Sequence, residues 1–243
     1  TIVAMGVGLA LVISIASSVA RSGKYVANQY FSVDALGALV LLIIAAVGFL
    51  VAVYSLYYLR EEVKKKIIGF HRVRQYFALF NLFIAAMYLA VISTNPIVMW
   101  IAIEATTLAT AFLISFYNKP SAMEAAWKYL IINSVGLMLG FFGTLLFLFI
   151  MLGATNDATL VSWDAIAENV SRVDPFLIKV AFIFVLIGYG TKMGLVPMHT
   201  WLPDAHSKAP VPISGLLSGV LLNVAFLAIL RYKFIVDKAT GAE

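Results

Sequence analysis

The sequence predicts an all-α polytopic membrane protein, with about seven transmembrane helices forming a single transmembrane domain over residues 1–243. Three observations predict this class. Hydrophobic residues make up 63% of the chain and charged residues 12%. The mean hydropathy is +0.98, higher than a soluble domain of this size requires. Apolar runs of about 18 or more residues, long enough to cross a bilayer as helices, recur along nearly the whole chain.

Seven apolar segments are long enough to span a bilayer, and their boundaries are defined to within about 4 residues. They cover residues 2–20, 35–59, 76–94, 97–117, 122–152, 176–202 and 211–233. Two segments carry local start signals. Ser121 with Glu124 forms a capping-box pattern, and Asp174 before Pro175 places a hydrogen-bond acceptor and a fixed φ at a helix entry.

The first segment opens without an initiator methionine. It also lacks the basic start and the small-residue cleavage site of a secretory signal. We therefore expect the sequence to be a fragment of a longer protein.

The loops predict the orientation of the chain. If the path alternates, the loop from Arg60 to Arg74 lies on the same side of the membrane as Lys119 and Lys208. That side then carries eight lysines and arginines, at positions 60, 64, 65, 66, 72, 74, 119 and 208. Such a bias marks the cytoplasmic side of a multi-pass protein of the cell's inner membrane. The formal charge of +5 is therefore an orientation signal, and nucleic acid is not expected as a partner.

Cysteine is absent from the sequence. The chain therefore has no disulfide and no thiolate to hold an iron–sulfur cluster. We expect no cofactor in this chain, so any redox centre must lie on a partner subunit. The motif of an ATP-binding phosphate loop is also missing, so direct use of ATP is not indicated.

Glu104 is the first ionisable residue expected inside the membrane. It lies about eight residues into its span, ~12 Å deep at ~1.5 Å per residue. An acidic group at the bilayer centre costs ~2.5 to 3.5 kcal/mol, so it normally faces a partner or a hydrated path. A purely structural ion pair between helices is the alternative interpretation.

Lys192 is the second such residue, in the segment 176–202. As a straight helix these 27 residues would be ~40 Å long, which exceeds the ~30 Å hydrocarbon core. We predict a helix break at Gly194 and Pro197, which is tolerated only where protein or a hydrated cavity surrounds it. Lysine suits proton transfer because its charge can be switched. Glu104 and Lys192 differ in predicted depth by only ~5 Å, so they could pair across helices.

Three further titratable residues are candidates for a proton path. Lys128 lies ~10 Å from its helix end, where it could also snorkel to the interface or pair with Glu124 four residues earlier. His199 and His206 flank the sequence Trp-Leu-Pro-Asp-Ala after the break, and a hydrogen-bonded structural role is equally compatible with them. Neither their spacing nor their neighbours form a metal site.

Small and amide residues predict helix packing. Gly136, Gly140 and Gly143 form a small-residue face that favours a close approach of helices. Asn223 is expected near mid-bilayer in the last span, where it could hydrogen-bond between helices rather than take part in transport.

Residues 192–222 have the sequence KMGLVPMHTWLPDAHSKAPVPISGLLSGVLL. This run resembles the signature of the antiporter-like proton-translocating subunits found in respiratory complex I, Mrp cation/proton antiporters and group 4 hydrogenases. Residues 100–108 and 124–134 support the resemblance, which covers about residues 30–233.

The resemblance implies a fold of about fourteen helices in two inverted repeats, of which this chain is similar to helices two to eight. It implies that Glu104 is the family's helix-five glutamate and that Lys192 is the lysine of the broken helix, which together form a coupling pair. Lys128 lies where the family often has a helix-six lysine. His206 falls in the connection toward the central hydrophilic axis.

Asn223 departs from the family pattern, because complex I subunits usually carry a lysine or histidine there. An amide cannot take up a proton, so this change puts the continuity of the path in doubt. Together with the amino-acid sequences of residues 103–108 and 221–225, the asparagine makes the chain more similar to the F-type membrane subunit of hydrogenase-4 or formate hydrogenlyase.

The resemblance therefore implies a non-catalytic, proton-translocating subunit of a complex I-related oxidoreductase, most similar to a group 4 hydrogenase. Its expected partners are the other membrane and peripheral subunits, which would carry iron–sulfur clusters and a nickel–iron site or a quinone, and the lipid bilayer. The alternatives are an Mrp-type cation/proton antiporter subunit and a structural subunit that anchors a redox arm.

Overall fold

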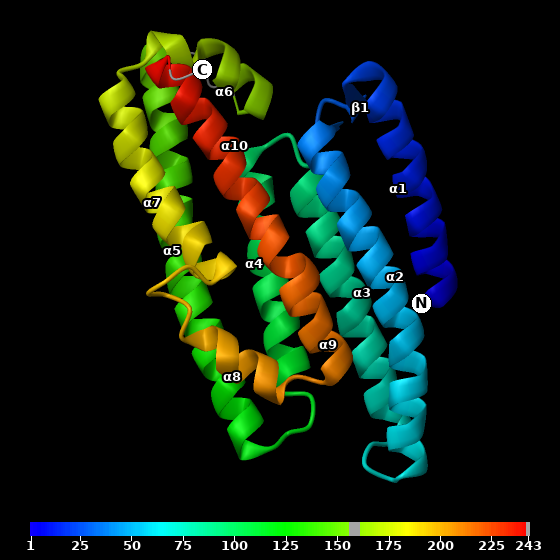
Figure 1. Cartoon of the computed structure of the whole chain (residues 1–243). Coiled ribbons are helices and arrows are strands. Elements are labelled where there is room, and N and C mark those ends of the chain that lie inside the picture. The colour runs from blue at the N-terminus through cyan, green and yellow to red at the C-terminus, as the bar shows by residue number, and fades with distance from the viewer. Residues whose placement is uncertain (156–160, 242–243) are drawn as a thin grey trace.

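The computed structural model describes residues 1–155 and 161–241. In those residues seven helical segments are long and apolar enough to cross a membrane, and they lie side by side in one bundle (Figure 1). The single helices are α1 (Ile2–Ser22), α2 (Ala35–Lys64), α3 (Phe70–Ile92), α4 (Pro96–Ile114), α5 (Pro120–Thr155) and α7 (Pro175–Met193). The last span joins α9 (Val211–Leu216), the π-helix η2 (Leu217–Leu221) and α10 (Leu222–Thr240). The predicted fold class is confirmed.

Shorter elements connect the spans. β1 (Lys24–Asn28) and β2 (Phe31–Asp34) form an antiparallel hairpin between α1 and α2. The short α6 (Trp163–Asn169) and the 3₁₀ helix η1 (Val170–Arg172) precede α7. In Figure 1 the hairpin and α6 lie at one end of the bundle, whereas the α2–α3 turn and the α4–α5 loop lie at the other. This arrangement agrees with the alternating path that predicts the basic end to be cytoplasmic.

The two predicted helix entries have different outcomes. Asp174 caps α7 as expected, since its Oδ1 accepts a hydrogen bond from the Phe176 N–H at 2.8 Å. The capping box at Ser121 is wrong. α5 already begins at Pro120, so Ser121 lies inside the helix, and Glu124 forms an ion pair with Lys128 Nζ at 2.8 Å instead.

The predicted segment 176–202 is not one continuous helix. α7 ends at Met193, and Gly194 follows it with a left-handed φ of 82°. Glycine takes this conformation without the penalty that a Cβ would bring. The chain then turns through Pro197 and starts the short α8 at Trp201 (Trp201–Lys208). The break therefore lies where Gly194 and Pro197 predict it.

α5 and α7 approach each other closely along the predicted glycine face. A Cβ on Gly143 would lie 2.8 Å from the Val185 nitrogen, and one on Gly188 would lie 2.2 Å from the Gly140 nitrogen. These are contacts with backbone atoms, which no change of side-chain rotamer can relieve. The small residues therefore fix the relative position of the two helices.

Arg231 connects α10 to the end of the bundle that carries the β-hairpin. Its guanidinium donates to the carbonyl oxygens of Val91 at 3.0 Å and Ser93 at 3.3 Å. It also lies 3.6 Å from Asp34 Oδ1, and its side chain is only 9% exposed. Hydropathy could not predict this contact, because it joins residues about 140 positions apart in the sequence.

Candidate functional site

Lys192 lies fully buried in the last turn of α7. Its Nζ donates to Thr107 Oγ1 at 2.9 Å and to the Tyr129 hydroxyl at 2.6 Å. It also lies 4.8 Å from the centre of the Tyr129 ring. The partially negative end of the α7 dipole favours a cation at this position. The lysine is therefore held by neutral oxygens and by a helix end.

Glu104 lies on α4, one helical turn before Thr107 and on the same face. Its Oε1 accepts a hydrogen bond from Ser134 Oγ at 2.7 Å. Its Oε2 is buried and has no hydrogen-bond partner among the described residues. A buried carboxylate oxygen without a donor is costly, which marks Glu104 as more than a packing residue.

The direct ion pair that the similar predicted depths of Glu104 and Lys192 allow is not formed. None of the ion pairs among the described residues joins these two side chains. Each instead contacts hydroxyls of α4 and α5, because Thr107 and Tyr129 hold the amine and Ser134 holds the carboxylate. Hydroxyl groups both donate and accept hydrogen bonds, so the arrangement can pass a proton as well as hold a charge.

α8 closes the lysine site toward the basic end of the bundle. Trp201 Nε1 donates to the Thr191 carbonyl oxygen at 2.9 Å. The Trp201 ring meets the Tyr129 ring edge-to-face, with centroids 5.1 Å apart. Both rings belong to a buried cluster with Ile114, Ala125, Ala126 and Ala205. This apolar plug separates Lys192 from solvent at that end.

We expect Trp201→Phe to lower thermal stability, because the Thr191 carbonyl would lose its donor while an aromatic ring is kept. The cost of such an unsatisfied buried acceptor is about 1–3 kcal/mol. Thermal unfolding of the purified protein in detergent measures it. The exposed Trp127 on α5 is the matched control, and equal effects of Trp127→Phe and Trp201→Phe would contradict the assigned role.

Lys128 lies outside the Lys192 cluster and links α5 to α8. Its Nζ lies 2.8 Å from Glu124 Oε1 and 3.2 Å from Asp204 Oδ2. The side chain is 49% exposed, so this group of charges is partly solvated. The predicted pairing with Glu124 is confirmed, and Asp204 is a partner that the sequence did not indicate. The role of Lys128 in a proton path stays a prediction.

The two histidines occupy different environments. His199 has a buried Nδ1 without a hydrogen-bond partner among the described residues. His206 Nδ1 lies 2.8 Å from Ser214 Oγ of α9. Partial burial lowers the pKa of His206 below its ordinary value, so a neutral ring is favoured at neutral pH. A neutral imidazole offers one donor and one acceptor nitrogen.

The expected hydrogen bond from Asn223 to another helix is not the one observed. Its Nδ2 donates to the Gly219 carbonyl of its own helix at 2.9 Å. Gly219 belongs to the π-helical turn η2, where the regular backbone bonding changes and a carbonyl is open to a side-chain donor. Asn223 therefore satisfies its own distorted helix.

The hydroxyl groups of the site, which are Thr107, Tyr129 and Ser134, were not predicted from the sequence. A signal was available for two of them. Thr107 follows Glu104 by one turn, and Tyr129 lies seven residues before Gly136 on the glycine face that contacts α7. Polar residues that continue such a packing face toward a buried charge are candidates for its partners.

Comparison with known proteins gives two family matches. Residues 93–242, more than half of the chain, match the family described as NADH:quinone oxidoreductase/Mrp antiporter, TM. Residues 20–66 match the model described as NADH-Ubiquinone oxidoreductase (complex I), chain 5 N-terminus.

Among individual relatives, the chain is 39% identical over 212 residues to the Hydrogenase-4 component F homolog of Methylacidiphilum infernorum. The match covers 86% of this chain and 44% of that protein, so the chain spans less than half the length of this relative.

Solved structures share the fold at low identity. A chain of the archaeal membrane-bound sulfane sulfur reductase superposes with a TM-score of 0.78 at 20% identity, covering 94% of this chain and 46% of that one. A chain of the Mrp complex from Dietzia sp. DQ12-45-1b gives 0.74 at 18% identity, covering 95% and 42%.

Proposed function

Since this chain belongs to the NADH:quinone oxidoreductase/Mrp antiporter transmembrane family, we propose that it translocates protons as a membrane subunit of a complex I-related oxidoreductase. It is a multi-pass membrane protein, with seven candidate spans in the residues described. On this proposal the complex to which the chain belongs is a group 4 membrane-bound hydrogenase, which the 39% identity to a hydrogenase-4 component F homolog supports.

One observation carries the proposal. Lys192 is 0% exposed at a helix break inside the bundle, and its amine contacts hydroxyl oxygens rather than a carboxylate. A purely structural lysine would be expected to lie against a counter-ion or to reach the interface. A buried amine between hydroxyl groups can instead gain and lose a proton.

Glu104 is the group that sets the charge of Lys192. An anionic Glu104 one turn from Thr107 stabilises the ammonium form of the lysine by Coulomb attraction. When the carboxylate is neutralised, that attraction is lost and release of the lysine proton is favoured. Restoring the charge favours reloading. Thr107 and Tyr129 contact the amine and Ser134 contacts the carboxylate, so neither group depends on a direct ion pair with the other.

The driving reaction is proposed to take place on partner subunits. With no cysteine, this chain supplies no thiolate for a cluster. Iron–sulfur clusters, with a nickel–iron site or a quinone, would belong to those partners. Mass spectrometry of the complex purified in mild detergent tests this. A co-purifying redox arm supports the proposal, whereas an assembly of transporter subunits alone would assign cation/proton antiport.

We expect Glu104→Gln to abolish proton translocation while electron transfer and assembly of the complex persist. Glutamine keeps the shape and can still contact Ser134, but it carries no charge to hold the lysine proton. The measurement is proton uptake into proteoliposomes that contain the intact complex. Loss of a positioned proton-transfer group lowers such rates by about 100-fold or more.

The control for this test is Glu168→Gln, which removes an exposed carboxylate of α6 outside the membrane spans. It should leave translocation unchanged. If the Glu104→Gln complex assembles and pumps at the wild-type rate, the proposed function is wrong.

A further inference from the structure

Glu62, near the end of α2, is a second carboxylate with unusual surroundings. Its Oε1 accepts a hydrogen bond from the Tyr117 hydroxyl at 2.6 Å. Its Oε2 is buried and has no hydrogen-bond partner among the described residues. No ion pair in this part of the chain includes Glu62, although it lies at the basic end of the bundle. The lone pairs of Oε2 are therefore available to accept a proton.

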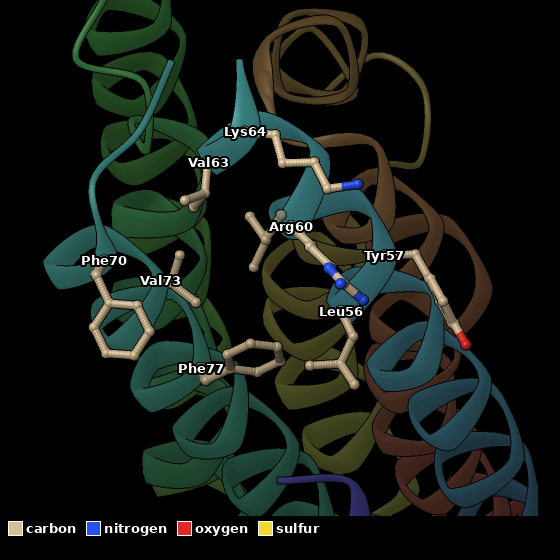
Figure 2. A pocket seen from close by; sticks show the side chains of 9 residues that line it. Leu56, Tyr57, Arg60, Val63, Lys64, Phe70, Val73 and Phe77 are labelled. Carbon is tan, nitrogen blue, oxygen red and sulfur yellow. The ribbon is translucent and has the colours of Figure 1, made fainter. Parts of the chain in front are cut away.

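The nearby cations of α2 lie on another face of the helix. Figure 2 shows Arg60 and Lys64 beside a groove between α2 and α3, which Phe70 and Phe77 also line. Lys64 forms its ion pair with the neighbouring Glu61. Glu62 does not line this groove, and among the described residues neither Arg60 nor Lys64 forms an ion pair with it.

Two tyrosines continue from Glu62 into the bundle. The hydroxyls of Tyr117 and Tyr58 lie 2.7 Å apart. Because Tyr117 gives its single proton to Glu62, Tyr58 must donate to Tyr117. The three groups therefore form one directed chain of hydrogen bonds, in which each hydroxyl can both donate and accept.

Other charged and titratable groups lie around the hydrogen-bond chain of Glu62, Tyr117 and Tyr58 without replacing its hydrogen bonds. Lys119 Nζ lies over the Tyr117 ring at 5.9 Å from its centre. The Tyr76 hydroxyl of α3 lies 2.8 Å from Ser55 Oγ. Ser55 lies one helical turn before Tyr58 on the same side of α2. A polar stripe of Ser55, Tyr58 and Glu62 thus runs along an otherwise apolar helix.

The inner end of this hydrogen-bond chain lies near His206. The Tyr58 hydroxyl lies against the backbone of Val211, the first residue of α9. Ser214, one turn further along the same helix, lies 2.8 Å from His206 Nδ1. The tyrosine chain therefore ends about one helical turn from a pair that can accept and donate a proton.

We propose that Glu62 takes up protons at the basic end of the bundle and passes them through Tyr117 and Tyr58 toward Ser214 and His206. A proton from water adds to the Glu62 carboxylate and gives the neutral acid. Tyr117 and Tyr58 then turn their hydroxyls, so that Tyr117 can donate to Tyr58 and Tyr58 can donate to water next to α9. In that orientation the acid donates to Tyr117 as Tyr117 donates to Tyr58 and Tyr58 releases its proton, which restores the hydrogen bonds seen in the structure. No bond other than O–H changes, so no oxidant or reductant is needed. The inference rests on the proposed function.

The test measures proton uptake by the intact complex in proteoliposomes after Glu62→Gln, Tyr117→Phe and Tyr58→Phe. Each variant should lower the initial rate by on the order of 10- to 100-fold. Glu61→Gln is the matched control, because the adjacent carboxylate is exposed and pairs with Lys64. Glu62→Asp should recover part of the rate, since it restores a proton acceptor.

The pH dependence separates uptake from a structural role. Without its acceptor the path must take protons from water directly, so the Glu62→Gln rate should rise as the external pH falls, and the wild-type rate should change less. A Glu62→Gln complex with the uptake rate and pH profile of wild type overturns this inference, even where Glu104→Gln stops translocation. Equal loss in Glu61→Gln and Glu62→Gln, or no translocation by the wild-type complex, also overturns it.

Discussion

Replacing Lys192 with methionine is expected to stop proton translocation and leave the protein folded. Methionine fills a similar volume with no charge. Because none of the ion pairs among the described residues includes Lys192, the change breaks no direct ion pair, whose disruption from one side would cost about 3–5 kcal/mol. The translocation rate should fall by about 100-fold or more, because the proton-carrying group is gone. Proton uptake into proteoliposomes and thermal unfolding in detergent measure the two effects.

Lys179→Met provides the control, since Lys179 is an exposed lysine on the same helix. It should change neither quantity appreciably. A Lys192→Met protein that pumps normally would favour the structural-anchor hypothesis. A variant that fails to fold would show instead that the ammonium group is required for packing.

Gly188→Ala is expected to cause the largest loss of stability of any glycine-to-alanine change in the described spans. The new Cβ would lie 2.2 Å from the Gly140 nitrogen and 2.4 Å from its Cα. These are backbone atoms, so α5 and α7 must separate. Overpacking of a closed interface costs about 1–3 kcal/mol, and more where only backbone can move. Thermal unfolding and the yield of assembled complex measure it.

Gly153→Ala on α5 is the matched comparison, because nothing lies within 4 Å of the position that its new Cβ would take. Alanine is the better helix former by up to about 1 kcal/mol, so this variant should be neutral or slightly more stable. If Gly188→Ala and Gly153→Ala melt alike, close packing of α5 and α7 does not hold the bundle.

The spans and the helix break could be predicted from sequence because they depend on local composition. Apolar length alone locates the seven spans, and glycine followed by proline marks the end of α7. The third span is longer than predicted, since α3 starts at Phe70 rather than at residue 76. The segment 70–75 carries Arg72 and Arg74, which lower its hydropathy although it remains helical.

The site was predictable in its charges and not in its partners. Glu104 and Lys192 stand out because single ionisable residues interrupt apolar runs. Hydropathy gives depth along a helix but not the rotation about its axis, so depth alone favoured a direct ion pair. The structure places Tyr129 and Thr107 around the lysine instead. Similarly, Glu62 lies among charged neighbours, where no pattern distinguishes it from the exposed Glu61.

The glycine contact between α5 and α7 has a consequence for how the site can change. α5 carries Tyr129 and Ser134, and α7 carries Lys192, so the backbone contact at Gly140 and Gly188 makes one rigid body of the lysine and its tyrosine. α4 contacts that body through side-chain hydrogen bonds, from Trp100 Nε1 to the Leu137 carbonyl oxygen at 2.7 Å and from Ser134 Oγ to Glu104 Oε1 at 2.7 Å. A sliding or rotation of α4 that breaks these bonds would move Glu104 and Thr107 relative to Lys192, while the contact between Lys192 and Tyr129 is kept. The coupling between a distant reaction and the protonation of Lys192 would then depend on the motion of this single helix.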